Sequence, residues 1–143
     1  MTVIVTGATS FIGRAVVKAL LEEGCRVVAV SRPASAGAGK LQELFEDLKK
    51  QAGAEKKVFG SLELCFCELG EIEKLEKIYK KEELQAKAWL HLGWDGAGSD
   101  KRKDVKLQEK NIGYALQSLH TAAALGCKRF LFSGSQAEYG ICN

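Results

Sequence analysis

The sequence predicts an α/β fold in which helices cover both faces of a parallel sheet of about five strands. Short β-branched apolar runs alternate with longer segments of helical periodicity along the whole chain. The first run, Thr2–Thr6, breaks into a glycine-punctuated turn that leads directly into a helix. This pattern favours the strand order 3-2-1-4-5, with a ligand crevice at the carboxyl ends of the strands, where strands 1 and 4 diverge.

Each predicted strand is a short apolar run bounded by turn residues. The strands cover residues 2–6, 26–30, 62–67, 87–92 and 129–132. The helices are assigned from apolar residues that recur three and four positions apart, and Gly24 and Gly126 supply stop signals. They cover residues 11–23, 40–51, 71–84 and 105–125. The residues that follow each strand are therefore the ones to inspect for function.

Composition narrows the class of protein. The 143 residues are 46% hydrophobic, enough for one domain with a real core, and the net charge of +3 gives no reason to expect nucleic acid. No apolar run is long enough to suggest a membrane segment. An odd number of cysteines in mostly apolar runs favours reduced thiols and a cytoplasmic location, and no His or Cys cluster suggests a metal site. The cysteines are Cys25, Cys65, Cys67, Cys127 and Cys142.

The turn after the first strand has the properties of a dinucleotide-binding loop. Gly7 permits the tight turn, and Gly13 lets the helix pack closely on the strand. The free N–H groups at the helix start suit a pyrophosphate. Ser10 departs from the usual middle glycine; its Cβ narrows the approach to the backbone, while its hydroxyl can donate to a phosphate. Thr9 is a further candidate contact. The alternative is a glycine-rich turn that binds nothing.

The end of the second strand predicts the cofactor. Many NAD-binding sheets carry an acidic residue there, which accepts hydrogen bonds from the adenosine ribose. Here the position is Ser31, followed by Arg32. A guanidinium pairs with the 2′-phosphate of NADP, so NADP is favoured over NAD. The alternative is that Arg32 is a solvated loop residue.

The ends of the third and fourth strands supply further candidates. Glu68 is a candidate acceptor for the adenine amino group, with the backbone of Leu69 donating to the ring; a solvated helix-capping glutamate is the alternative. Leu92 and Gly93 follow the fourth strand, where glycine allows the backbone to pass close to a ribose. His91 lies within that strand, so a core histidine is favoured over a catalytic one.

Four motifs together make a resemblance specific. They are residues 6–13 (TGATSFIG), 91–93 (HLG), 111–116 (NIGYAL) and 130–140 (FLFSGSQAEYG). In this order and spacing they resemble the N-terminal half of the extended short-chain dehydrogenases/reductases, the NAD-dependent epimerase/dehydratase family. The resemblance covers essentially the whole chain.

The resemblance implies a Rossmann fold with a small C-terminal substrate domain, and chemistry on nucleotide-linked sugars. It implies that Ser135 is the active-site serine, which hydrogen-bonds a substrate hydroxyl or carbonyl. Asn111 matches the helix asparagine that steadies the active site. The pyrophosphate turn is matched by Gly7, Phe11, Ile12 and Gly13.

The family's reaction needs a Tyr-x-x-x-Lys pair, expected a few tens of residues after the serine. The sequence ends at Asn143, eight residues after Ser135, and Asn143 stands where Tyr139 would need its lysine. The resemblance therefore implies the cofactor-binding part of an epimerase, dehydratase or reductase, inactive alone. The alternatives are a standalone NADP-binding sensor or partner subunit, and a relic without function.

The fifth strand predicts self-association. With no further strand, residues 129–132 form an apolar edge that is unpaired on one side. Such an edge readily pairs with another chain.

Overall fold

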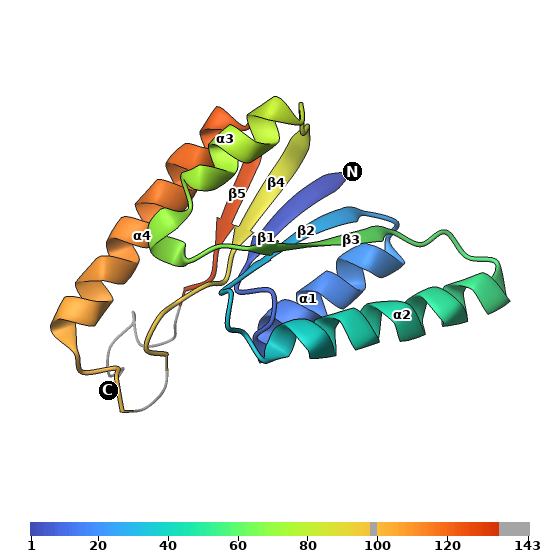
Figure 1. Ribbon diagram of the computed structural model, residues 1–143, viewed down its shortest axis with the longest axis horizontal. Coiled ribbons are helices and arrows are strands. Elements are labelled where there is room, and N and C mark those ends of the chain that lie inside the picture. Colours follow the sequence, from blue (N-terminus) through green and yellow to red (C-terminus); the bar gives the residue numbers. More distant parts are fainter. Residues whose placement is uncertain (98–99, 135–143) are drawn as a thin grey trace, which may run out of the picture.

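The computed structural model describes residues 1–97 and 100–134 and has the predicted architecture (Figure 1). The parallel sheet has the order β3-β2-β1-β4-β5, which confirms the predicted topology. The strands are β1 (Thr2–Thr6), β2 (Arg26–Ser31), β3 (Ser61–Phe66), β4 (Ala86–His91) and β5 (Arg129–Phe132). The helices are α1 (Phe11–Glu22), α2 (Gly37–Glu55), η1 (Leu69–Glu71), α3 (Lys74–Lys81) and α4 (Val105–Ala124).

The sheet separates two hydrophobic cores, because neighbouring side chains of a strand point to opposite faces. On one face Val3 and Val5 of β1 pack with residues of α1 and α2. On the other face Ile4 lies among Trp89 of β4 and residues of α3 and α4, including Tyr79. Figure 1 shows the two pairs of helices on opposite sides of the twisted sheet. The buried centre fixes the carboxyl ends of β1 and β4 side by side, with Thr6 paired to His91.

Helix α2 is longer than its periodicity indicates. It begins at Gly37, before the predicted start at residue 40, and ends at Glu55 rather than residue 51. Lys56 ends it in the left-handed conformation, with φ of 54°. Gly39 and Gly53 lie inside the helix with open space around them, so they lower its intrinsic stability without interrupting it.

The predicted helix over residues 71–84 is wrong at both ends. The chain first forms the short 3₁₀ helix η1, and regular α-helix runs only from Lys74 to Lys81. Glu83 has a φ of 52°, which stops α3 before Leu84. Leu84 instead turns into the core and packs beneath the sheet. The apolar residues that predicted one long helix therefore belong to three consecutive segments, which are η1, α3 and the turn that leads to Leu84.

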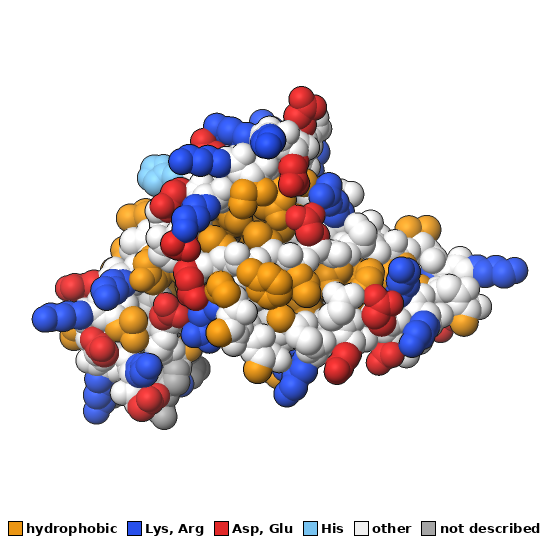
Figure 2. Space-filling view, in the orientation of Figure 1, with side chains coloured by type: hydrophobic (Ala, Val, Ile, Leu, Met, Phe, Trp, Pro, Cys, Tyr) orange, Lys and Arg blue, Asp and Glu red, His pale blue; other side chains and the backbone are white. Residues whose placement is uncertain are grey.

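Both edges of the sheet carry exposed apolar side chains. At the β5 edge, Leu131 and Phe132 are 51% and 45% exposed. At the β3 edge, Phe66 is 53% exposed. Figure 2 shows hydrophobic side chains gathered along β3 and between β3 and α3, with charges of both signs around them. None of the described helices is long and apolar enough to cross a membrane.

Candidate functional site

The turn between β1 and α1 is built by glycines whose positions leave no room for a side chain. Gly7 has a φ of +68°, and a Cβ there would lie 2.7 Å from the backbone of Leu92 and Gly93. A Cβ at Gly13 would lie 2.1 Å from the carbonyl oxygen of Gly7. The first turn of α1 therefore packs directly on the β1 end, as a pyrophosphate loop requires.

Ser10 stabilises the start of α1. Its Oγ accepts a hydrogen bond of 2.9 Å from the N–H of Gly13, and its backbone is extended, as at a helix N-cap. The N–H groups of Phe11 and Ile12 have no acceptor among the described residues, and both side chains are largely exposed. The departure at position 10 thus leaves two free donors at the positive end of a twelve-residue helix. The proton of the Ser10 hydroxyl remains available to a ligand.

Two residues of this site were missed by the sequence analysis. The guanidinium of Arg14 donates a 2.8 Å hydrogen bond to the carbonyl of Thr9, which puts a cation beside the turn. The hydroxyls of Thr9 and Ser35 lie 2.9 Å apart and are hydrogen-bonded. Arg14 follows Ser10 by one helical turn and helical side chains lean toward the N-terminus, so its position carries a usable signal. The contact of Ser35 is tertiary and has no local signal.

Ser31 and Arg32 are in different environments. Ser31 ends β2 and is buried, and its Oγ has no partner among the described residues. Arg32 is exposed in the following loop and forms no ion pair with a described residue. The guanidinium is therefore free for a ligand, whereas Ser31 is enclosed at the end of its strand.

The ends of β1 and β4 are joined by side chains. The hydroxyl of Thr6 is 3.0 Å from Nδ1 of His91 and accepts a 3.3 Å hydrogen bond from the N–H of Gly93. Burial lowers the pKa of His91 to about 4, so the ring is neutral at pH 7. It stacks with Phe130 and Phe132. This environment is that of a core histidine.

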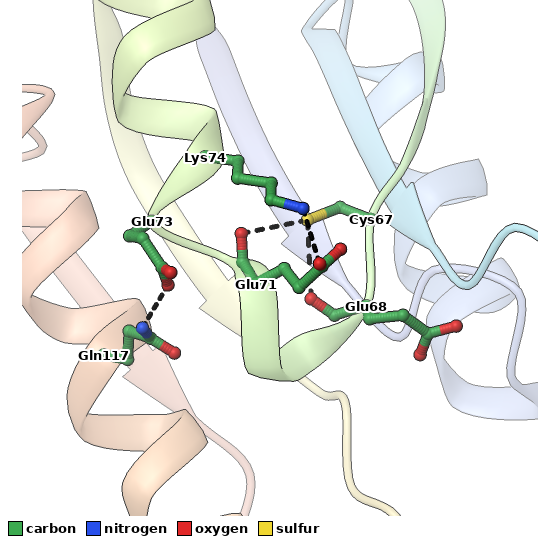
Figure 3. A network of polar contacts seen from close by, with 6 residues as sticks. All are labelled: Cys67, Glu68, Glu71, Glu73, Lys74 and Gln117. Carbon is green, nitrogen blue, oxygen red and sulfur yellow. Dashed lines mark hydrogen bonds and ion pairs between the residues drawn. The ribbon is translucent and has the colours of Figure 1, made fainter.

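In the loop after β3, Leu69 packs against the end of β4, whereas the side chain of Glu68 is exposed. A Cβ at Gly93 would lie 2.8 Å from the side chain of Leu69, so η1 packs against the end of β4. Glu68 is exposed and its carboxylate does not cap η1. Figure 3 shows this carboxylate directed away from Cys67, Glu71 and Lys74.

The thiol of Cys67 is chemically quiet. It lies 3.4 Å from each of the carbonyl oxygens of Glu68 and Glu71 and donates toward them. Burial raises its pKa to about 11. The described residues contain no cluster of His, Cys, Asp or Glu that could hold a metal ion.

Asn111 anchors the loop that follows β4. Its side chain accepts a 2.9 Å hydrogen bond from the N–H of Asp95 and donates one of 2.8 Å to the carbonyl of the same residue. Asn111 is buried, and this pair of bonds ties α4 to the crevice side of the sheet. Ser135 lies outside the described residues, eight residues before the last residue given.

An apolar groove of about 340 Å³ lies beside this loop, between α4 and β5. Trp94 and Phe132 form one side, with their rings 5.9 Å apart and tilted. The Trp94 ring N–H donates to Gln108 at 2.7 Å. Two residues of β5, Phe130 and Phe132, line the groove, so it reaches this edge strand of the sheet. The groove is lined by Trp94, Ile112, Ala115, Leu116, Leu119, Phe130 and Phe132.

Known proteins resemble the chain in sequence. UDP-glucose 4-epimerase 2 of Arabidopsis thaliana is 31% identical over 140 residues, which are 97% of this chain and 37% of that protein. The dTDP-6-deoxy-L-talose 4-dehydrogenase (NAD(+)) of Aggregatibacter actinomycetemcomitans is 31% identical over 141 residues, 98% of this chain and 43% of that protein. The chain thus spans less than half the length of these relatives.

Known structures resemble the chain in fold. The UDP-glucose 4-epimerase of Bifidobacterium longum, in complex with NAD+ and UDP, superposes with a TM-score of 0.74 at 20% identity. The match covers 98% of this chain and 38% of the epimerase. The profile of the NAD dependent epimerase/dehydratase family matches residues 3–143. With the glycine turn, the strand order and the joined ends of β1 and β4, this match shows that the chain belongs to the NAD-dependent epimerase/dehydratase family.

Proposed function

We propose that residues 1–143 form the cofactor-binding domain of an enzyme that epimerises, dehydrates or reduces a nucleotide-linked sugar. The observation that carries this proposal is the turn before α1, where the N–H groups of Phe11 and Ile12 are free and a guanidinium lies alongside. Such a group of donors binds a pyrophosphate. The relatives named above act on UDP-glucose and a dTDP-linked sugar, which supports a sugar nucleotide as substrate.

Replacing Ser10 by aspartate tests the turn. A carboxylate keeps the cap on Gly13 and favours the helix dipole, so the free energy of unfolding should stay within about 0.5 kcal/mol of the wild type or rise. The same charge repels a pyrophosphate, and NADPH affinity measured by nicotinamide fluorescence should fall at least tenfold. Ser10→Asn, which caps without charge, is the control. Unchanged NADPH affinity in the aspartate variant would refute binding at this turn.

We propose that the cofactor is NADP rather than NAD. Arg32 is exposed and unpaired among the described side chains, and no acidic residue ends β2 to receive a ribose hydroxyl. A guanidinium at this place favours a 2′-phosphate by charge and by paired hydrogen bonds. Arg32→Ala should weaken NADPH binding about tenfold and leave NADH binding unchanged. Tighter binding of NADH than of NADPH by the wild type would refute the preference.

We propose that this domain binds cofactor without turnover when it is alone. None of its three tyrosines is followed four residues later by lysine, since Glu83, Ser118 and Asn143 stand at those positions. The role of Ser135 is tested in a longer chain that carries the Tyr-x-x-x-Lys pair, where Ser135→Ala should lower turnover strongly. If no such longer chain exists, the second candidate function is a standalone NADP-binding sensor or partner subunit.

We also propose that the isolated domain self-associates through β5 and the neighbouring groove. Leu131 and Phe132 are about half exposed on a strand that has no outer neighbour in the described part of the chain. Leu131→Lys should shift the protein to monomer in sedimentation at micromolar concentration, whereas Ile78→Lys, at an exposed position of α3, should not. A monomeric wild type contradicts the proposal.

The four described cysteines are unpaired, which favours a reducing compartment such as the cytoplasm.

A further inference from the structure

Ser35 is the point at which the loop after β2 meets the glycine turn. Its N–H donates a 3.0 Å hydrogen bond to the carbonyl of Arg32, which closes a four-residue turn. Pro33 occupies the second position of that turn, where its fixed φ is favourable. The carbonyl of Ser35 accepts a 3.1 Å bond from Ala38, at the start of α2. Its backbone is therefore held on both sides.

The Ser35 hydroxyl connects this loop to the candidate pyrophosphate site. It is hydrogen-bonded at 2.9 Å to the hydroxyl of Thr9, 26 residues earlier in the chain. The carbonyl of Thr9 in turn accepts the 2.8 Å bond from Arg14. One chain of hydrogen bonds thus joins the backbone of Arg32 to the guanidinium of Arg14. Both ends of this chain of hydrogen bonds are arginines, Arg32 through its backbone carbonyl and Arg14 through its side chain.

The packing beside this contact is equally close. A Cβ at Gly37 would lie 2.8 Å from the Cβ of Thr9 and 2.9 Å from its carbonyl oxygen. The first turn of α2 therefore packs directly against the glycine turn. The loop that joins β2 to α2 is short. Figure 1 shows α1 and α2 beginning next to each other at the carboxyl ends of β1 and β2.

We propose that the hydrogen bond between Ser35 and Thr9 positions Arg32 for the 2′-phosphate of NADP, which makes Ser35 a specificity-determining positioning residue. The inference rests on the proposed preference for NADP. Without the bond, the loop of Arg32 must be ordered by the ligand, and part of the binding free energy is lost. NADH makes no use of Arg32 and is affected little. Ser35 itself need not touch the cofactor.

The experiment compares NADPH and NADH affinities, by nicotinamide fluorescence, in Ser35→Ala, Arg32→Ala and the double variant. Ser35→Ala should weaken NADPH binding about fivefold, the change in an equilibrium constant that one ordinary hydrogen bond produces, with less than a twofold change for NADH. In the Arg32→Ala background the Ser35 change should have no further effect on NADPH. Ser35→Thr, which retains the hydroxyl, should bind both as the wild type does. Ser61→Ala, an exposed serine on β3, is the control.

The outcomes separate the two proposals. If Arg32→Ala leaves NADPH affinity unchanged, the NADP preference is wrong and the role of Ser35 is overturned with it. If Arg32→Ala weakens NADPH but Ser35→Ala does not, only the role of Ser35 is overturned. Equal losses for NADPH and NADH, or additive losses in the double variant, overturn it as well, because a merely structural contact would give those results.

Discussion

Replacing Gly13 by alanine tests whether close packing sets the geometry of the candidate cofactor site. The added Cβ would lie 2.1 Å from the carbonyl oxygen of Gly7 and 2.8 Å from Cα of Ala8. Ordinary contact begins at 3.4 Å, so the helix or the turn must move by about 1.3 Å. Overpacking of a rigid site typically costs about 1 to 3 kcal/mol. The same displacement misaligns the free N–H groups of α1.

Gly53 provides the matched control. It lies inside α2, and an added Cβ there meets nothing within 4 Å. Alanine in an exposed helix is more favourable than glycine by about 0.8 kcal/mol. Both glycines lie inside helices, so this gain is common to the two variants, and we expect their free energies of unfolding, measured in urea, to differ by the overpacking cost of about 1 to 3 kcal/mol. NADPH affinity should fall at least tenfold in Gly13→Ala alone. Equal stability and equal affinity in the two variants would refute the packing argument.

Three further predictions concern the core and the loops. Burial lowers the pKa of His91 to about 4 from an unfolded value near 6.5. The free energy of unfolding should therefore be full above pH 6.5 and lower by about 2 kcal/mol at pH 5. In urea titrations, His91→Gln should lack this loss. Tyr79→Phe removes a 2.7 Å bond to the Glu63 carboxylate and should cost about 2 kcal/mol, whereas Tyr114→Phe should cost less than about 0.5 kcal/mol in the same assay. Asn111→Ala removes both bonds to the loop after β4, and we expect a loss of about 2 kcal/mol with faster amide exchange in that loop.

The strands and their order follow from the sequence because each strand is a short apolar run bounded by turn residues. The run at residues 129–132 matches β5 without correction. Helix ends were less predictable. Residues 71–84 form an apolar stripe, yet the chain changes conformation at Glu83 without a glycine or proline to mark the place. Tertiary packing of Leu84 into the core decides that ending, and local periodicity carries no information about it.

The residues of the candidate site also differ in how far the sequence predicts them. The glycine turn was predictable because local geometry requires both of its glycines. Gly7 has a positive φ, and Gly13 lets the helix pack closely on the turn. The hydroxyl of Ser35 was not, because its partner is 26 residues away and is brought close only by the sheet. Arg14 was predictable in principle from its spacing to Ser10.

Two glycines at the carboxyl ends of β1 and β4 have a consequence for the comparison of related sequences. Gly7 and Gly93 are required by contacts within the protein: the backbone of Leu92 and Gly93 lies against one, and the side chain of Leu69 against the other. A descendant that had stopped binding nucleotides would still need both to fold. Retention of these two glycines in a related sequence therefore indicates that the fold is kept, and it does not indicate that nucleotide binding is kept. Loss of function would be recorded first at Arg32 and Ser35, which are partly or fully exposed and which the cores do not require.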